Sequence, residues 1–284
     1  MPALVIARLQ LQELVRRRLF LALLILTAGV IALTTWGFSR IVTLDSGRPI
    51  SGTEITTIAS QLLILVMFMF SLTLGFCAVF ASAPSVSAEI ESGIALSLLA
   101  RPLSRTEYIV GKWLGIVGMV LLYGIPSVAL QMVLVRVVVN YVPPHPLEFL
   151  AFVVGEAVVI GTFALALSTR FAGMVGGVAA LILWGAAWLA GIVGGVGAVF
   201  ENATLTHVGT ASKLILPTDG LWRGAVWSLE PASIIAAARA AGRLTAGNPF
   251  FAPDPPPLTY VAWCVVWIAG LLGIAIWSFS RREL

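Results

Sequence analysis

Six apolar segments constrain the fold of this chain more than any other feature. An α-helix needs roughly 20 apolar residues to cross the hydrocarbon core of a bilayer, which is about 30 Å thick. The segments cover residues 19–38, 57–83, 113–139, 147–168, 172–200 and 258–279. Of the 284 residues, 59% are hydrophobic and only 11% are charged, whereas about 25% are charged in a typical soluble domain. We therefore expect an all-α membrane protein with six transmembrane helices, formed by residues 1–284 as a single domain.

Residues 3–18 are expected to form an amphipathic helix in the membrane interface. Their apolar side chains recur at helical spacing, and Arg16-Arg17-Arg18 would lie at the lipid headgroups. The apolar run that follows is too long for the hydrophobic region of a signal peptide, roughly 7–15 residues, so we interpret it as an uncleaved first span. Lys and Arg are more frequent on the side that carries both termini. The positive-inside rule then places both termini in the cytosol. We expect the protein to lie in the plasma (inner) membrane.

One long loop, residues 201–257, lies on the external side in this topology. Thr218 or Asp219 is a suitable N-cap for a short helix over residues 221–229, and a proline ends that helix. Residues 233–244 are predicted to form a second helix. We therefore expect short external helices between the fifth and sixth spans.

Residues 88–115 are the most charged stretch between the two ends of the chain. An acidic turn around Glu89 opens the stretch, and its first helix should end before Pro102, because a residue that precedes proline disfavours the helical region. Ser104 and Glu107 then follow the S-x-x-E pattern of a capping box. The stretch is thus predicted to be a helix, a break, and a second helix that continues into the third span.

This pattern resembles the cytosolic segment of permease subunits of type-2 ATP-binding-cassette (ABC) transporters. In that family an acidic E-x-x-x-G helix, a leucine pair, P-x-S-R and G-K precede the third span. The matching residues here are Glu89, Gly93, Leu98, Leu99, Pro102, Ser104, Arg105, Gly111 and Lys112. The resemblance implies that the segment is a coupling helix that touches a separate cytosolic ATPase subunit. The residues expected to take part are Glu89, Glu91, Gly93, Leu96, Pro102, Ser104, Arg105 and Lys112.

The same resemblance implies a function and partners. The chain would be the permease of an ABC exporter, paired with an identical or paralogous second permease in the lipid bilayer. ATP and Mg²⁺ would bind the partner ATPase, and this chain itself would need no cofactor. Glu89 and Gly93 are expected to share the helix face that meets the ATPase. Gly93 would cost about 1 kcal/mol relative to alanine inside a helix, which either close approach of the partner or a helix bend would explain.

Two polar residues lie inside predicted spans. Glu156 is about nine residues into the fourth span, roughly 13 Å deep at 1.5 Å per residue, and Gln131 lies at nearly the same depth in the third span. An acid within the membrane is costly and is usually paired. We therefore expect a protonated Glu156 bonded to Gln131 as a tie within the helical hairpin. The alternative is that Glu156 lines a substrate path.

Glycine pairs with small-xxx-small spacing occur in the fifth span, at Gly173/Gly177 and Gly191/Gly195. Such pairs permit two helix backbones to approach closely. A bundle of six spans needs several close contacts, so we interpret these pairs as intramolecular packing rather than as a dimer seam. Trp184 and Trp188 are interpreted as packing residues of the same span.

Several chemistries are absent from the sequence. There is no G-x-x-x-x-G-K-[ST] phosphate loop, so the chain cannot be the subunit that hydrolyses nucleotide. It has no metal-ligand motif and no nucleophile motif, and its basic residues do not indicate nucleic acid. We therefore expect a non-enzymatic membrane subunit.

Two other functions remain open. The first is a non-transporting ABC-type module, which couples ATP hydrolysis to an external partner protein in metallocentre maturation or envelope remodelling. The second is an unrelated secondary transporter or channel. The second class would show buried charges or broken helices at repeated positions of two halves, and the sequence contains no such internal repeat.

Overall fold

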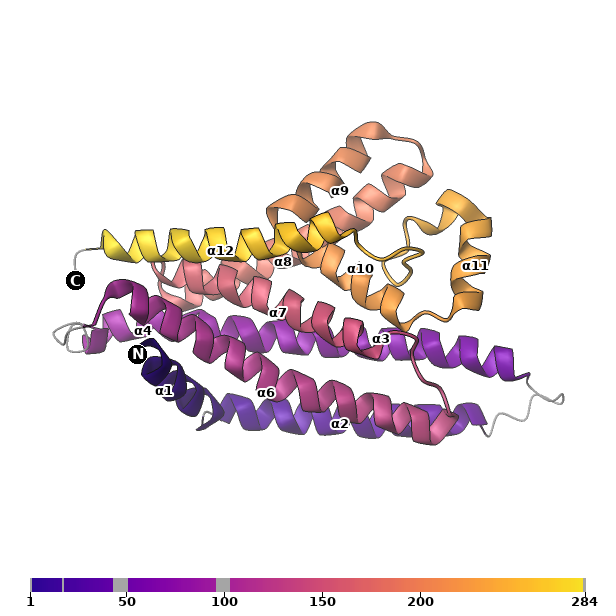
Figure 1. Cartoon of the computed structure of the whole chain (residues 1–284), viewed down its shortest axis with the longest axis horizontal. Coiled ribbons are helices and arrows are strands. Elements are labelled where there is room, and N and C mark those ends of the chain that lie inside the picture. Colours follow the sequence, from indigo (N-terminus) through magenta and orange to yellow (C-terminus); the bar gives the residue numbers. More distant parts are fainter. Residues whose placement is uncertain (1, 17, 43–50, 96–102, 283–284) are drawn as a thin grey trace.

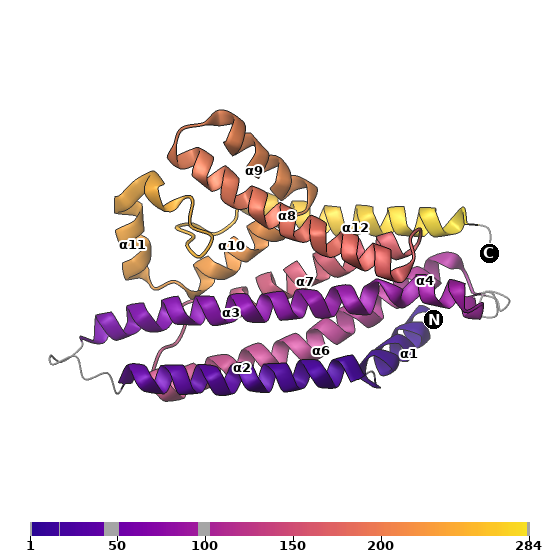
Figure 2. The ribbon, with the colours of Figure 1, turned by 180° about the vertical axis from the view of Figure 1, so that it is seen from behind.

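The structure, a computed structural model, describes residues 2–16, 18–42, 51–95 and 103–282. These residues form helices and no β-strand. Six helices within the described ranges are long and apolar enough to cross a membrane, and they lie side by side in one bundle (Figures 1 and 2). They are α2 (Arg18–Val42), α3 (Gly52–Ser82), α6 (Arg105–Val139), α7 (Pro146–Ser168), α8 (Gly173–Val199) and α12 (Leu258–Ser280). The predicted all-helical fold with six long apolar helices is confirmed.

Capping boxes make α3 and α6 longer than their apolar runs. At the start of α6 the Glu107 N–H donates to Ser104 Oγ over 3.1 Å, and the Ser104 N–H donates to Glu107 Oε2 over 3.1 Å. This confirms the predicted box. Ser51 and Glu54 make the same reciprocal bonds at the start of α3, over 3.2 and 2.9 Å. Because each box supplies partners for N–H groups that the helix leaves unpaired, both helices begin in polar sequence before their apolar runs.

The N-terminal helix α1 (Pro2–Arg16) packs against the first turns of α6. Two glycines of α6 permit this contact. A Cβ atom at Gly111 would lie 2.7 Å from Ile6 Cβ, and one at Gly115 would lie 2.6 Å from Gln10 Cβ. Leu9 of α1 is 58% exposed. Helix α1 thus packs on α6 with one face and leaves apolar side chains such as Leu9 uncovered elsewhere on its surface.

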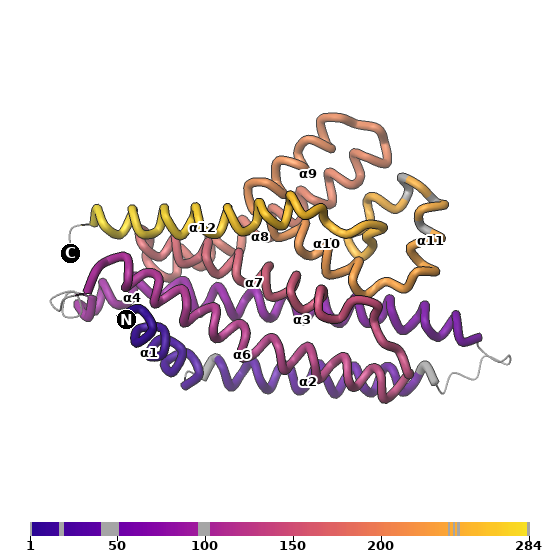
Figure 3. The backbone as a smooth tube through the Cα atoms, viewed as in Figure 1, coloured from indigo at the N-terminus to yellow at the C-terminus, as the bar shows by residue number. Residues whose placement is uncertain are grey.

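Three helices and a 3₁₀ turn lie between α8 and α12, at the end of the bundle opposite the two chain termini (Figure 3). They are α9 (Ala203–Ile215), α10 (Thr218–Leu229), α11 (Ala232–Ala241) and η1 (Gly242–Thr245). The two short helices expected here correspond to α10 and to α11 with η1. The third helix, α9, was not predicted; its N-cap is Asn202.

Neither residue that was predicted to cap α10 does so. Pro217 occupies the cap position and provides no side-chain bond. Asp219 lies within the first turn, 1% exposed, and its Oδ2 is 3.2 Å from Arg223 Nε and 3.5 Å from Lys213 Nζ. Two cations therefore hold the carboxylate inside the fold, because a buried charge needs compensation more than the helix start needs a cap.

Glycines of α8 make close intramolecular contacts, as expected. A Cβ atom at Gly177 would lie 3.1 Å from Ala83 Cβ, at the junction of α3 and α4, and one at Gly194 would lie 2.6 Å from the Gly209 Cα of α9. Gly191 leaves room for the carboxylate of Asp219. These glycines therefore seat α9, α10 and the start of α4 against α8.

Candidate functional site

The segment that resembles a coupling helix lies at the end of the bundle that also holds both termini (Figures 1 and 2). It begins in α4 (Pro84–Glu91), which continues from α3 after Ala83. On one side α4 rests on α8, where a Cβ atom at Gly173 would lie 3.1 Å from Pro84 Cα. Its first turn is buried, whereas its last residue, Glu91, is exposed.

A polar network joins α4 to α6 and α1. Lys112 of α6 is only 4% exposed, and its ammonium group forms an ion pair with Glu89 of α4. The same ammonium group donates to Gln10 Oε1 of α1 over 2.6 Å, and the Tyr108 hydroxyl donates to the second carboxylate oxygen of Glu89 over 2.6 Å. A buried ammonium group requires such partners. Lys112 therefore links α6 to both α1 and α4, and Glu89 is the residue of α4 in this link.

This geometry corrects the expectation that Glu89 faces a partner protein. Its side chain is 18% exposed and turns toward Lys112 and Tyr108. Exposed positions nearby are Ala88, Glu91, Ser92 and Gly93, which we call the α4 turn surface. Helical spacing correctly places Glu89 on one face of α4, but that face is the inner one.

Gly93 is not inside a helix. Helix α4 ends at Glu91, Ser92 is its C-cap, and Gly93 has a φ of 74°. No atom would lie within 4 Å of a Cβ there, so the residue is needed for its left-handed backbone rather than for its small size. The expectation that Gly93 shares a helix face with Glu89 is therefore wrong. Leu96, Leu98, Leu99 and Pro102 lie outside the described residues.

Arg105 makes its contacts within the chain, at the end of α12. Its Nη1 lies 2.9 Å from each of three carbonyl oxygens, those of Phe279, Ser280 and Arg282. The last carbonyls of a helix lack intrahelical partners, and a cation there also suits the helix dipole. Ser104 caps α6 next to it. Of the matched S-R pair, Ser104 thus caps α6, and Arg105 joins the start of α6 to the end of α12.

Sequence reasoning missed Gln10 and Tyr108. Tyr108 and Lys112 are four residues apart, so helical periodicity places them on the same face of α6. The sequence contains no comparable signal for Gln10, because its contact depends on how α1 crosses α6.

The predicted hairpin tie between Glu156 and Gln131 is wrong. Glu156 is 6% exposed, and its Oε2 accepts a hydrogen bond from Ser71 Oγ of α3 over 2.6 Å. Both amide atoms of Gln131 are buried without a partner in the described chain. Equal depth in two spans therefore does not bring the two side chains together, since each also has a direction around its helix axis.

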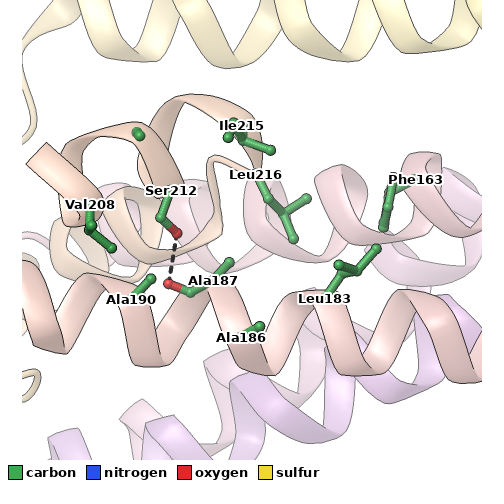
Figure 4. A pocket seen from close by; sticks show the side chains of 10 residues that line it. Phe163, Leu183, Ala186, Ala187, Ala190, Val208, Ser212, Ile215 and Leu216 are labelled. Atoms are coloured by element: carbon green, nitrogen blue, oxygen red, sulfur yellow. Dashed lines mark hydrogen bonds between the residues drawn. The ribbon is translucent and has the colours of Figure 1, made fainter.

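Two of the cavities among the described residues border α8. One, of about 300 Å³, is lined by Glu156 and by aromatic side chains of α3 and α8. The other, of about 410 Å³, lies between α8 and α9 (Figure 4). Its lining is almost wholly apolar, and Ser212 Oγ donates to the Ala187 carbonyl over 3.0 Å. The first cavity therefore combines apolar walls with a buried acid, whereas the second offers apolar contact.

The sequence was compared with protein-family models and with curated proteins, and neither comparison found a match. The described residues contain no group of three or more His, Cys, Asp or Glu side chains that could hold a metal ion. What the fold defines is a multi-pass membrane protein with six candidate spans.

Proposed function

We propose that the chain is the transmembrane permease subunit of an ABC transporter and exports its substrate. ATP hydrolysis occurs on a separate cytosolic ATPase subunit, which binds ATP and Mg²⁺. A second permease, identical or paralogous, completes the path through the bilayer. The proposal begins from the motif resemblance around residues 88–112, and it places that end of the bundle in the cytosol of a plasma (inner) membrane protein.

One observation supports the proposal most: α4 is both partly exposed and firmly tied to the spans. Glu91 and its neighbours on the α4 turn surface are open to a partner, while Glu89 is paired with Lys112 of α6. The start of α4 packs against Gly173 and Gly177 of α8. A push on the α4 turn surface would therefore be passed to α6 and α8 through close contacts, as a coupling helix requires.

The proposal has a direct biochemical test. The chain is co-expressed with the ATPase encoded beside it, which should carry a phosphate loop, and the two are purified together in a maltoside detergent. Glu91→Lys on the α4 turn surface should reduce the amount of ATPase that co-purifies. The matched control is Asp254→Lys, an exposed acid of the loop between η1 and α12, which should leave co-purification unchanged. Equal ATPase recovery with both variants would contradict docking at α4.

A non-transporting ABC module is the second candidate, and the helical region over residues 201–257 favours it. On α9, Ile215 is 73% exposed and Leu214 is 48% exposed, so apolar side chains there are available to an external protein. ATP hydrolysis by the reconstituted complex without any flux into or out of proteoliposomes would favour this module over an exporter.

The proposed orientation can be checked separately. A cysteine introduced at Gly247 should react with a membrane-impermeant reagent added to intact cells. One introduced at Ser92 should react only after the cells are permeabilised. Reaction of the cysteine at 247 from the cytosolic side alone would reverse the orientation.

A further inference from the structure

The cavity beside Glu156 lies near the middle of the bundle, between α3, α7 and α8. Glu156 is the eleventh residue of the 23-residue α7, so it lies far from both ends of that helix. Besides Glu156, four aromatic side chains line the cavity: Phe68, Phe76, Trp184 and Trp188. Its volume, about 300 Å³, is at the lower end of the range for small-molecule sites, roughly 300–1,000 Å³.

Contacts behind the cavity wall hold the aromatic side chains in place. The Trp184 ring lies directly on the backbone of Gly75, where any Cβ atom would clash with it. The Phe76 ring meets Trp184 edge to face with centroids 5.8 Å apart, and the Phe68 ring stacks on Trp188 at 5.5 Å. A wall built in this way is formed before any ligand binds.

Glu156 places a carboxyl group in this wall, and few hydrogen bonds and no ion pair among the described residues stabilise a charge on it. The Ser71 hydroxyl donates to it over 2.6 Å, and Trp184 lines the same cavity. None of the ion pairs found among the described residues includes Glu156. An acid within a membrane is usually paired with a cation or lines a functional path, and the described chain supplies no cation here.

We propose that this cavity binds an organic cation with an apolar body, such as a quaternary ammonium compound. The Glu156 carboxylate supplies the opposite charge, and the rings of Trp184 and Trp188 supply cation–π attraction, which is strongest for tryptophan. The cavity opens between α3 and α8, where Phe76 is 40% exposed. A ligand that partitions into the bilayer can therefore enter from the side.

If the cation is also the exported substrate, that part of the inference rests on the proposed function. Binding of the cation to the cavity does not depend on the proposed function. The experiment therefore uses the purified chain alone, without ATPase or ATP, so that failure of binding and failure of transport are separate results. The probe is benzyltrimethylammonium, and its neutral isostere is neopentylbenzene, in which carbon replaces the charged nitrogen. Binding of each is measured by titration calorimetry in a maltoside detergent.

The wild-type protein should bind the cation at least about tenfold more tightly than the neutral isostere, since each 1.4 kcal/mol of added attraction is tenfold in affinity. Glu156→Gln keeps an acceptor for Ser71 and should weaken binding of the cation by about 10- to 100-fold, with little change for the isostere. Trp184→Leu should weaken binding of the cation by about tenfold. The matched control is Gln131→Leu, which replaces a buried polar residue that does not line the cavity and should leave both affinities unchanged.

Equal binding of the cation and its isostere by the wild-type protein would overturn the proposal without relying on any variant. So would unchanged binding of the cation by folded Glu156→Gln. If neither compound binds the wild-type protein, the cavity is not a site for an apolar cation, and the proposal is also overturned.

Discussion

Removal of the Glu89 carboxylate should destabilise the whole bundle, because Glu89 compensates a buried charge. In Glu89→Ala the Lys112 ammonium, whose side chain is 5% exposed, would retain Gln10 and lose its only described ion-pair partner. The Tyr108 hydroxyl would also lose its acceptor. The variant therefore leaves one buried cation and one buried donor without their partners.

The size of the effect follows from this geometry. Breaking a fully buried ion pair costs about 3–5 kcal/mol. The Glu89 side chain is 18% exposed, so water can reach the site, and we expect the low end of that range, about 3 kcal/mol. Replacement of both partners, in Glu89→Ala with Lys112→Met, should be much less costly than the first change alone, since no unpaired charge remains.

The assay is the apparent melting temperature of the purified protein in detergent. The matched control is Glu91→Ala, two residues away on the same helix and exposed, which should change stability by no more than about 0.5 kcal/mol. If Glu89→Ala melts at the same temperature as Glu91→Ala, the network is not a structural link. If the double variant is less stable than Glu89→Ala, the account of the buried charge is wrong.

Two further predictions concern packing and pH. Gly111→Ala should cost about 1–3 kcal/mol, because its Cβ would lie 2.7 Å from Ile6 Cβ; Gly118→Ala, whose Cβ would meet nothing closer than 3.7 Å, should be neutral or stabilising in the same melting assay. Glu230 is 1% exposed, and burial raises the pKa of its carboxyl group from 4.5 to about 8. Between those two values the folded protein keeps a proton that the unfolded chain has lost, so stability should fall as pH rises from about 4.5 to 8, by up to about 1.4 kcal/mol per pH unit. The variant Glu230→Gln should lack this component, and an identical pH dependence in both proteins would exclude it.

Local signals in the sequence predicted much of the fold. The apolar runs are long enough to define the six long helices, and the S-x-x-E box at Ser104 defines the start of α6 because its bonds join residues three apart. Both features depend on neighbours in the chain. The features of these helices that could be predicted from the sequence therefore depend mostly on contacts between residues close together in the chain.

Contacts between distant segments were predicted less well, for a physical reason. The position of a side chain in a span has two coordinates: its depth in the membrane and its direction around the helix axis. The sequence gives the depth, but only packing determines the direction. Glu156 and Gln131 share the first coordinate, yet Glu156 turns to Ser71 of α3. The Asp219 carboxylate similarly meets Lys213 and Arg223 instead of capping α10. In both cases, tertiary contacts decide where a buried acid points.

The candidate coupling segment shows the same limit. Its motif marked Glu89 and Lys112 as important, but their pairing depends on how α6 packs beside the end of α4. Gly93 was placed in a helix because spacing alone cannot distinguish a helical glycine from one that follows a C-cap. The φ of 74° at that residue makes the distinction.

The most direct test of the central claim is a site-specific cross-link from the α4 turn surface. A photoreactive benzoylphenylalanine is placed at Glu91, or at Asp254 as the control in the loop between η1 and α12, in cells that express the chain with its neighbouring ATPase. After irradiation, position 91 should form a covalent adduct with the ATPase subunit, and position 254 should form none. An adduct from position 254, or none from position 91 while the two proteins co-purify, would contradict coupling through α4.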